Sequence, residues 1–179
     1  MKASLEANLA LLAQGDCLLA RLDDAAYVRT LPSVFGASIG GHMRHNLDHF
    51  RCFLAGVQSG RIDYSARTRE ARLETDRRHA RAEIARLGRA LAGLPPGGAL
   101  HVRRESDPDG AWAPSSLARE LDFLMSHTIH HYAIVAILCR LQDIVPEPGF
   151  GVAPSTLRHQ ATPSPATVFP ATPPLPCAP

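Results

Sequence analysis

LARELDFLMSHTIHHYAIVAILCRLQ, residues 117–142, is the most apolar of the long segments that have helical periodicity. Pro114, Ser115 and Ser116 precede it and mark the start of a helix. Apolar residues occur on nearly every side of that helix, at Leu117, Leu121, Phe123, Leu124, Ile129, Ile134, Val135, Ile137 and Leu138. A helix that is apolar all round lies in the interior of a protein. The rest of the chain is therefore expected to pack around this segment.

Three further segments, at about 3–22, 38–57 and 67–92, also have helical periodicity. Ser38 suits the N-cap of the second, and the third ends before Pro95-Pro96-Gly97-Gly98. Between 99 and 112, LHVRRE alternates apolar and polar residues, and SDPDG is a strong turn signal. The sequence thus predicts an all-α fold, a four-helix bundle with a short irregular or hairpin excursion before the last long helix.

Length and composition predict one domain over 1–150, followed by a C-terminal extension over 151–179. The segment from 161 to 179 contains seven prolines and almost no charge, so we expect it to be disordered. A net charge of +2 argues against a nucleic-acid partner. No run approaches the roughly 18 apolar residues that a membrane span needs. Four cysteines without CxxC spacing predict reduced thiols in a cytoplasmic protein.

Two of the predicted helices carry clusters of histidines. GHMRHNLDHF, residues 41–50, places His42, His45 and His49 on one stripe, because residues three or four apart on a helix lie about 5–6 Å apart. SHTIHHY, residues 126–132, places His127 and His131 side by side in the same way. Neutral imidazole is the commonest metal ligand, and an i, i+4 pair can share one ion. The first stripe could then supply a third ligand from a second helix.

The motifs Ser38-Ile39-x5-His45-x2-Asp48 and His127-x2-His130-His131 resemble those of the DinB/YfiT-like superfamily. That superfamily includes metal-dependent DinB proteins and bacterial thiol-dependent S-transferases. The resemblance covers roughly residues 3–145. It implies an up-down-down-up bundle in which His45, His127 and His131 hold a divalent metal. His130 would then face another helix or the partner in a homodimer.

Some features leave alternatives open or depart from that family. His42 and His49 flank His45 on the same stripe, so either could replace it or add a ligand. After the histidine pair the family often has Arg-Gly-Gln, whereas this chain has Tyr132-Ala133-Ile134. The segment IDYSARTREARLETD, residues 62–76, looks like a feature of one subgroup of the family, and the resemblance does not imply an activity for that subgroup.

Three imidazoles on rigid helices leave coordination positions open for water or substrate. Zinc or nickel suits an all-nitrogen set, and an added carboxylate would favour iron or manganese. Such a site can lower the pKa of water for hydrolysis, or bind a low-molecular-weight thiol as thiolate for transfer to a small-molecule substrate. Asp48 and Glu120 are candidates to accept hydrogen bonds from the ligand rings.

Two classes of function follow from the histidines. The first is a metal-dependent enzyme, similar to a thiol S-transferase or a hydrolase. The second is a non-catalytic, stress-associated bundle that a metal stabilises. An open coordination position beside a ligand pocket would favour the enzyme. A closed site, completed by His42 or His49, would favour the stabilised bundle.

Overall fold

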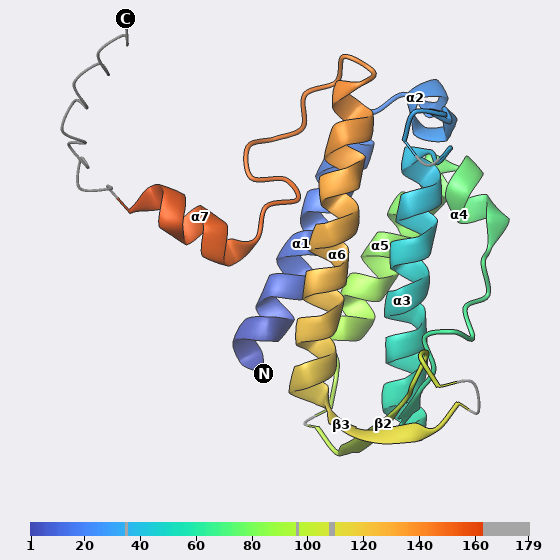
Figure 1. The fold of residues 1–179 in the computed structure, drawn as a ribbon, viewed down its shortest axis with the longest axis vertical. Helices are drawn as coiled ribbons and strands as arrows, with labels where there is room; N and C mark the ends of the chain where they lie inside the picture. The colour runs from blue at the N-terminus through green and yellow to red at the C-terminus, as the bar shows by residue number, and fades with distance from the viewer. Residues whose placement is uncertain (35, 96, 108–109, 163–179) are drawn as a thin grey trace, which may run out of the picture.

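The computed structural model describes residues 1–162 except 35, 96 and 108–109, and four long helices dominate it. These helices lie side by side in Figure 1: α1 (Lys2–Arg21), α3 (Ile39–Ser59), α5 (Arg77–Ala92) and α6 (Leu117–Arg140). The helices α1 and α6 run in one direction, and α3 and α5 run in the other. The helix α6 packs against both α1 and α3. This arrangement brings the two histidine-bearing helices, α3 and α6, together.

A small sheet lies at one end of the long helices, so the all-α prediction is wrong (Figure 1). Its strands are β1 (Arg61–Ile62), β2 (Ala99–Arg103) and β3 (Trp112–Ser116), in the order β1-β2-β3. Strand β2 pairs antiparallel with β3 and parallel with β1. The sequence signals between 99 and 112 are local to β2 and its turn. The partner β1 comes from a segment nearly forty residues earlier, where two residues carry no readable pattern.

The third predicted helix, 67–92, is broken into two. Its helical parts are α4 (Ala71–Thr75) and α5. Asp76, in an extended conformation, separates them. The Asp76 carboxylate accepts a hydrogen bond of 2.9 Å from the backbone N–H of His79 and so caps α5. An Asp side chain competes for backbone groups in this way, which ends one helix and begins another. Residues 63–70, the 63–70 connection, run outside any helix or strand from β1 to α4.

Two short helices lie where the sequence has no helical periodicity. The helix α2 (Asp24–Val28) begins at Asp23, whose side chain accepts a hydrogen bond from the Ala26 N–H. The helix α7 (Pro154–Ala161) begins at a proline and buries none of its residues. The cap at Asp23 and the proline at the start of α7 are signals of single residues, which periodicity does not reveal. The proline-rich segment expected to be disordered lies outside the described residues from 163 onward.

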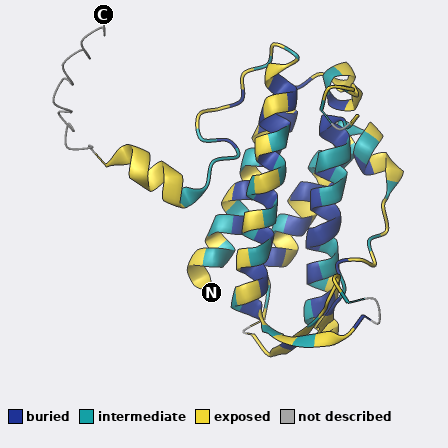
Figure 2. Cartoon of the chain, viewed as in Figure 1, coloured by how far each residue is buried: buried dark blue, intermediate teal, exposed yellow. Residues whose placement is uncertain are grey.

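The core lies between the four long helices (Figure 2). Its largest fully buried side chains include Tyr27, Phe50, Phe53 and Tyr132. The helix α6 is buried against α1 and α3 but is open on one side, where Ile137 is 50% exposed. It is therefore not the fully enclosed helix that its composition predicts. Among the described residues, no helix combines the length and the apolar character needed to cross a membrane.

Candidate metal centre

Three histidines from two helices meet in one cluster. His45 comes from α3, and His127 and His131 come from neighbouring turns of α6. One ring nitrogen from each lies within 4.8 Å of the other two. The ring centroids of His45 lie 5.1 Å from His127 and 4.5 Å from His131. These three side chains, the histidine triad, are the set that the resemblance assigned to the metal.

The helix caps help to set where the triad lies. The Ser38 hydroxyl accepts a hydrogen bond of 2.9 Å from the Gly41 N–H, and so starts α3 seven residues before His45. The Ser116 hydroxyl accepts one of 3.3 Å from the Arg119 N–H at the start of α6. From these starting points, the periodicity of each helix turns its histidines toward the other helix.

The imidazoles of the triad are neutral at pH 7. Burial is the main cause, and the charges of nearby histidines add to it. Together they lower the pKa of His45 to about 4, of His131 to about 3 and of His127 to about 2. A neutral imidazole keeps a lone pair for a metal. The Nε2 atom of His127 is buried and has no hydrogen-bond partner among the described residues, which is costly unless a metal or a water engages it.

His49 lies against the triad, but other groups engage both of its nitrogens. Its ring centroid is 3.9 Å from that of His127. Its Nδ1 lies 2.8 Å from the backbone oxygen of His45, which can only accept, so Nδ1–H donates. Its Nε2 then accepts from the Arg67 guanidinium at 3.3 Å. His49 is therefore placed as a neighbour of the triad with no lone pair left for a metal.

His42 is also outside the triad and contacts one member of it. Its Nδ1 lies 2.9 Å from Nδ1 of His131, so one of these nitrogens donates a hydrogen bond to the other. The Nε2 of His42 is buried without a partner among the described residues. With Nδ1 of His131 engaged, Nε2 is the nitrogen of that ring that stays open to a metal. His42 thus orients His131.

The structure does not bring Asp48 and Glu120 to the triad, although both are buried. Asp48 accepts a hydrogen bond of 3.1 Å from the backbone N–H of Arg69 and lies 3.8 Å from the Arg51 guanidinium. Burial, outweighing these contacts, raises its pKa. The partners of Glu120 in the described part of the chain are Tyr64, Ser115 and Arg119. Neither carboxylate therefore hydrogen-bonds to a histidine among the described residues.

His130, the fourth histidine of the second motif, points elsewhere. It is exposed, and it lines a groove that α1, α6 and the start of α7 form. Its ring stands edge-on to that of His131 at 5.1 Å. An exposed imidazole on the outer side of α6 is available to a partner but not to the triad.

Two aromatic side chains, which the sequence analysis did not single out as site residues, form a wall beside the triad. The Tyr64 ring stacks on His49 at 5.5 Å, and the Phe123 ring lies 5.7 Å from that of His127. The two aromatic rings are 4.8 Å apart. The Tyr64 hydroxyl donates to the Glu120 carboxylate at 2.9 Å, which holds the wall in place. Helical periodicity does not reveal Tyr64, because this residue lies in the 63–70 connection, outside any helix or strand.

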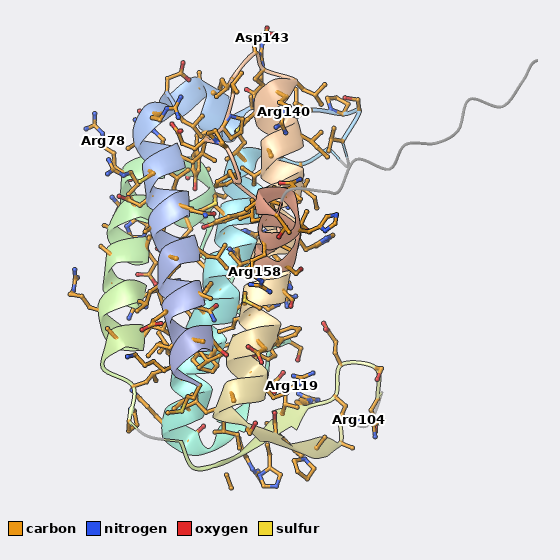
Figure 3. All side chains as sticks on the ribbon, turned by 90° about the vertical axis from the view of Figure 1, so that its left-hand side faces the viewer. Arg78, Arg104, Arg119, Arg140, Asp143 and Arg158 are labelled. Carbon is orange, nitrogen blue, oxygen red and sulfur yellow. The ribbon has the colours of Figure 1, made fainter. Side chains whose placement is uncertain are left out.

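A cavity of about 610 Å³ lies on the far side of that wall. Residues of the hairpin β2–β3 and of the start of α6 line it, together with Tyr64 and Phe123. Figure 3 shows Arg104 on the hairpin and Arg119 on α6 at this end of the molecule, and both also line the cavity. Its volume is typical of sites for small molecules. The triad therefore has a ligand-sized space next to it, one aromatic layer away.

Comparisons of the chain with models of protein families, with curated proteins and with solved structures find no match.

Proposed function

We propose that this chain is a DinB-like, metal-dependent enzyme in which His45, His127 and His131 hold one divalent ion. The observation that carries the proposal is the histidine triad: three neutral ring nitrogens within 4.8 Å of one another, from two packed helices. Neutral imidazole at this spacing suits a single transition-metal ion. The unpartnered, buried Nε2 of His127 supports it, because a metal would engage that atom.

The donor set favours zinc or nickel. Imidazole nitrogens suit both metals, whereas iron and manganese sites commonly add a carboxylate. Asp48, the acidic residue nearest in sequence to His45 on α3, accepts from the Arg69 N–H and lies 3.8 Å from Arg51, and it does not belong to the group that the three histidines form. Glu120 is committed to Tyr64, Ser115 and Arg119. An all-nitrogen site is therefore the better proposal.

An enzyme is a better proposal than a metal that only stabilises the fold. A closed structural site needs a fourth ligand, and neither candidate, His42 or His49, belongs to the group of ring nitrogens that lie within 4.8 Å of one another. His49 uses both nitrogens on His45 and Arg67, and His42 contacts His131 through Nδ1. All three histidines of the triad are only half-buried. Three protein ligands without a fourth are typical of catalytic sites.

Several residues of the chain would prepare such a site for chemistry. When bound, zinc or nickel supplies Lewis acidity that lowers the pKa of a coordinated thiol or water. His42 holds the ring of His131 in one orientation. Tyr64 and Phe123 cover one side of the triad and limit the access of water from there. The proposed reaction is transfer of a thiol to an electrophilic small molecule, or hydrolysis of such a molecule.

The proposal keeps the location and assembly expected from the sequence, a cytoplasmic homodimer. Cys17, Cys52 and Cys139 are free thiols, which suits a reducing compartment. The exposed His130 on the outer side of α6 is available to a second copy of the chain.

Metal content tests the proposal. Purified wild type, His127→Ala and His101→Ala would be loaded with zinc or nickel, dialysed and analysed by elemental mass spectrometry. His101 is an exposed histidine on β2 and is the matched control. We expect one ion per chain in wild type and in His101→Ala, and none in His127→Ala. Absence of metal from wild type, or its retention in His127→Ala, would contradict the proposed site.

A further inference from the structure

Arg67 is a cation at the edge of the metal centre, and among the described residues it forms no ion pair. Across the described residues, no acidic side chain lies within 4.0 Å of its guanidinium. Its neighbours Arg44 and Arg51, in contrast, form ion pairs with Glu74 and Glu83. The contacts of Arg67 are with neutral acceptors: its Nη1 lies 2.8 Å from the backbone oxygen of Tyr64 and 3.3 Å from Nε2 of His49.

Two contacts fix the position of the Arg67 side chain, and both involve the same guanidinium nitrogen. Both contacts involve Nη1, so Nε and Nη2 have no protein partner in the part of the chain that the structure describes. His49 can accept from Arg67 because its own Nδ1–H is committed to the backbone oxygen of His45. His49 is thus a positioning residue for Arg67. A guanidinium held by one nitrogen presents its remaining N–H groups in a rigid fork.

Arg67 lies one ring away from the triad. His49, which it contacts, has its ring centroid 4.5 Å from that of His45 and 3.9 Å from that of His127. A short molecule bound at the triad could therefore reach the guanidinium.

Charge balance at the site calls for an anion. An imidazole that binds a metal is uncharged, so an ion held by the three histidines would keep its full positive charge. Arg67 adds a second cation in a half-buried position. The buried carboxylate of Asp48 forms no ion pair with Arg67; its Oδ2 accepts from the Arg69 N–H, and Arg51 lies 3.8 Å from its Oδ1. Two cations close together in partly buried surroundings are unfavourable unless an anion lies between them.

We propose that the substrate of the metal site carries a carboxylate, and that Arg67 binds it through its unengaged N–H groups. This inference rests on the proposed function and narrows it to small molecules with an anionic end. The planar fork of arginine matches a carboxylate, and hydrogen bonds between charged groups are about twice as strong as neutral ones. Arg67 is therefore a specificity-determining residue. The thiol or electrophile at the other end of the molecule would lie at the triad.

Two thiols that differ in charge test this inference on cobalt-loaded protein. The probe 3-mercaptopropionate has a carboxylate, and 2-mercaptoethanol has a neutral hydroxyl. The binding of each thiol would be followed by the change in the visible spectrum of the cobalt site. We expect wild type to bind 3-mercaptopropionate about tenfold more tightly, and Arg67→Gln to lose that preference while its affinity for 2-mercaptoethanol is unchanged.

Matched variants separate a local effect from a general effect of charge or folding. Arg78→Gln removes the same charge from an exposed position on α5 that projects into solvent in Figure 3, and it should behave as wild type. Arg67→Lys keeps the charge without the fork and should lie between wild type and Arg67→Gln. His49→Gln should weaken the preference yet keep the cobalt spectrum.

The possible outcomes distinguish failure of the role of Arg67 from failure of the metal site. If Arg67→Gln and Arg67→Lys both give the cobalt spectrum and both keep the wild-type preference for 3-mercaptopropionate, the role of Arg67 is overturned and the metal site is supported. If wild type shows no cobalt spectrum, the proposed function and this inference both fail. A loss of preference in Arg78→Gln equal to that in Arg67→Gln would show a general charge effect and would also overturn the role of Arg67.

Discussion

The Thr128 hydroxyl donates a hydrogen bond of 3.1 Å to Oδ1 of Asn46, and both side chains are fully buried between α3 and α6. Thr128 follows His127 in the chain, and Asn46 follows His45. The bond therefore ties the two helices together one residue away from the triad. The Nδ2 atom of Asn46 has no partner among the described residues, so this bond is the one that satisfies its side chain there.

Thr128→Val should destabilise the protein by about 1–3 kcal/mol, because it keeps the shape of the side chain but leaves buried Asn46 without its hydrogen bond. Unfolding in urea would measure this. It should also weaken metal binding, since the register of α3 against α6 places the triad. Thr75→Val, on the exposed surface of α4, is the control and should change stability by about 0.5 kcal/mol or less. Equal stabilities for the two variants would contradict the role of the Asn46–Thr128 bond.

His42→Ala should weaken metal binding about 10- to 100-fold without changing the stoichiometry. His42 contacts Nδ1 of His131 and so orients that ring, but it lies outside the triad. Titration against a competing chelator would give the affinity. His45→Ala, in contrast, should abolish stoichiometric binding. If His42→Ala lost the metal as completely as His45→Ala, His42 would itself be a ligand.

Metal affinity should be nearly constant between pH 7.5 and 6 and should fall below about pH 5. Burial, followed by the charges of neighbouring histidines, lowers the pKa of His45 to about 4 and of His131 to about 3. Protons compete with a metal only as the pH falls toward these values. Exposed histidines would begin to lose the metal near their ordinary pKa of about 6.5. A large fall in affinity between pH 7.5 and 6, measured by the same titration, would show that the triad titrates as if exposed.

Glu83→Gln should reduce the free energy of unfolding at pH 7 by on the order of 3 kcal/mol. Burial raises the pKa of Glu83, but hydrogen bonds from Arg86 and Arg51 outweigh it and lower that pKa from 4.5 to about 2. A lowered carboxylate pKa stabilises the fold above the unfolded value, and this stabilisation is lost as the pH falls from 4.5 toward 2. The difference between wild type and variant should therefore shrink at pH 3.

Urea unfolding at pH 7 and pH 3 measures this difference. Glu6→Gln, which removes an exposed charge 3.9 Å from Lys2, should leave stability nearly unchanged at both values. A difference for Glu83→Gln that is the same at pH 7 and pH 3 would mean that the ion pairs of Glu83 do not lower its pKa.

Gly15→Ala and Gly88→Ala should change stability in opposite directions. A Cβ at Gly15 of α1 would clash with the Tyr132 hydroxyl, which donates to the backbone oxygen of Leu11. Overpacking there should cost about 1–3 kcal/mol. A Cβ at Gly88 of α5 would meet no atom within 4 Å, so alanine should stabilise that helix by up to about 1 kcal/mol. Thermal unfolding of both variants would test whether α1 and α6 approach as closely as Gly15 indicates.

Local periodicity was enough to locate most of the helical content. The expected helices at 3–22, 38–57 and 117–142 correspond to α1 (Lys2–Arg21), α3 (Ile39–Ser59) and α6 (Leu117–Arg140). The apolar side of each is visible within a few turns, because residues three or four apart share a face. Periodicity could not reveal the break at Asp76 or the strand β1. A cap competes with the helix at a single residue, and a two-residue strand exists only through its pairing with β2.

The sequence by itself determined that His127 and His131 would project side by side, and that α3 would carry a stripe of histidines toward a partner helix. These relations depend only on the helical repeat. Tertiary structure decided which histidine of the stripe joins them. The antiparallel packing of α3 against α6 brings His45 to the pair. The tertiary structure also makes His42 a hydrogen-bond partner of His131, and His49 a hydrogen-bond partner of Arg67. Tertiary structure also decided that Arg67 lies at the site. Arg67 is outside any helix or strand, so its position depends on its tertiary contacts and not on the helical repeat.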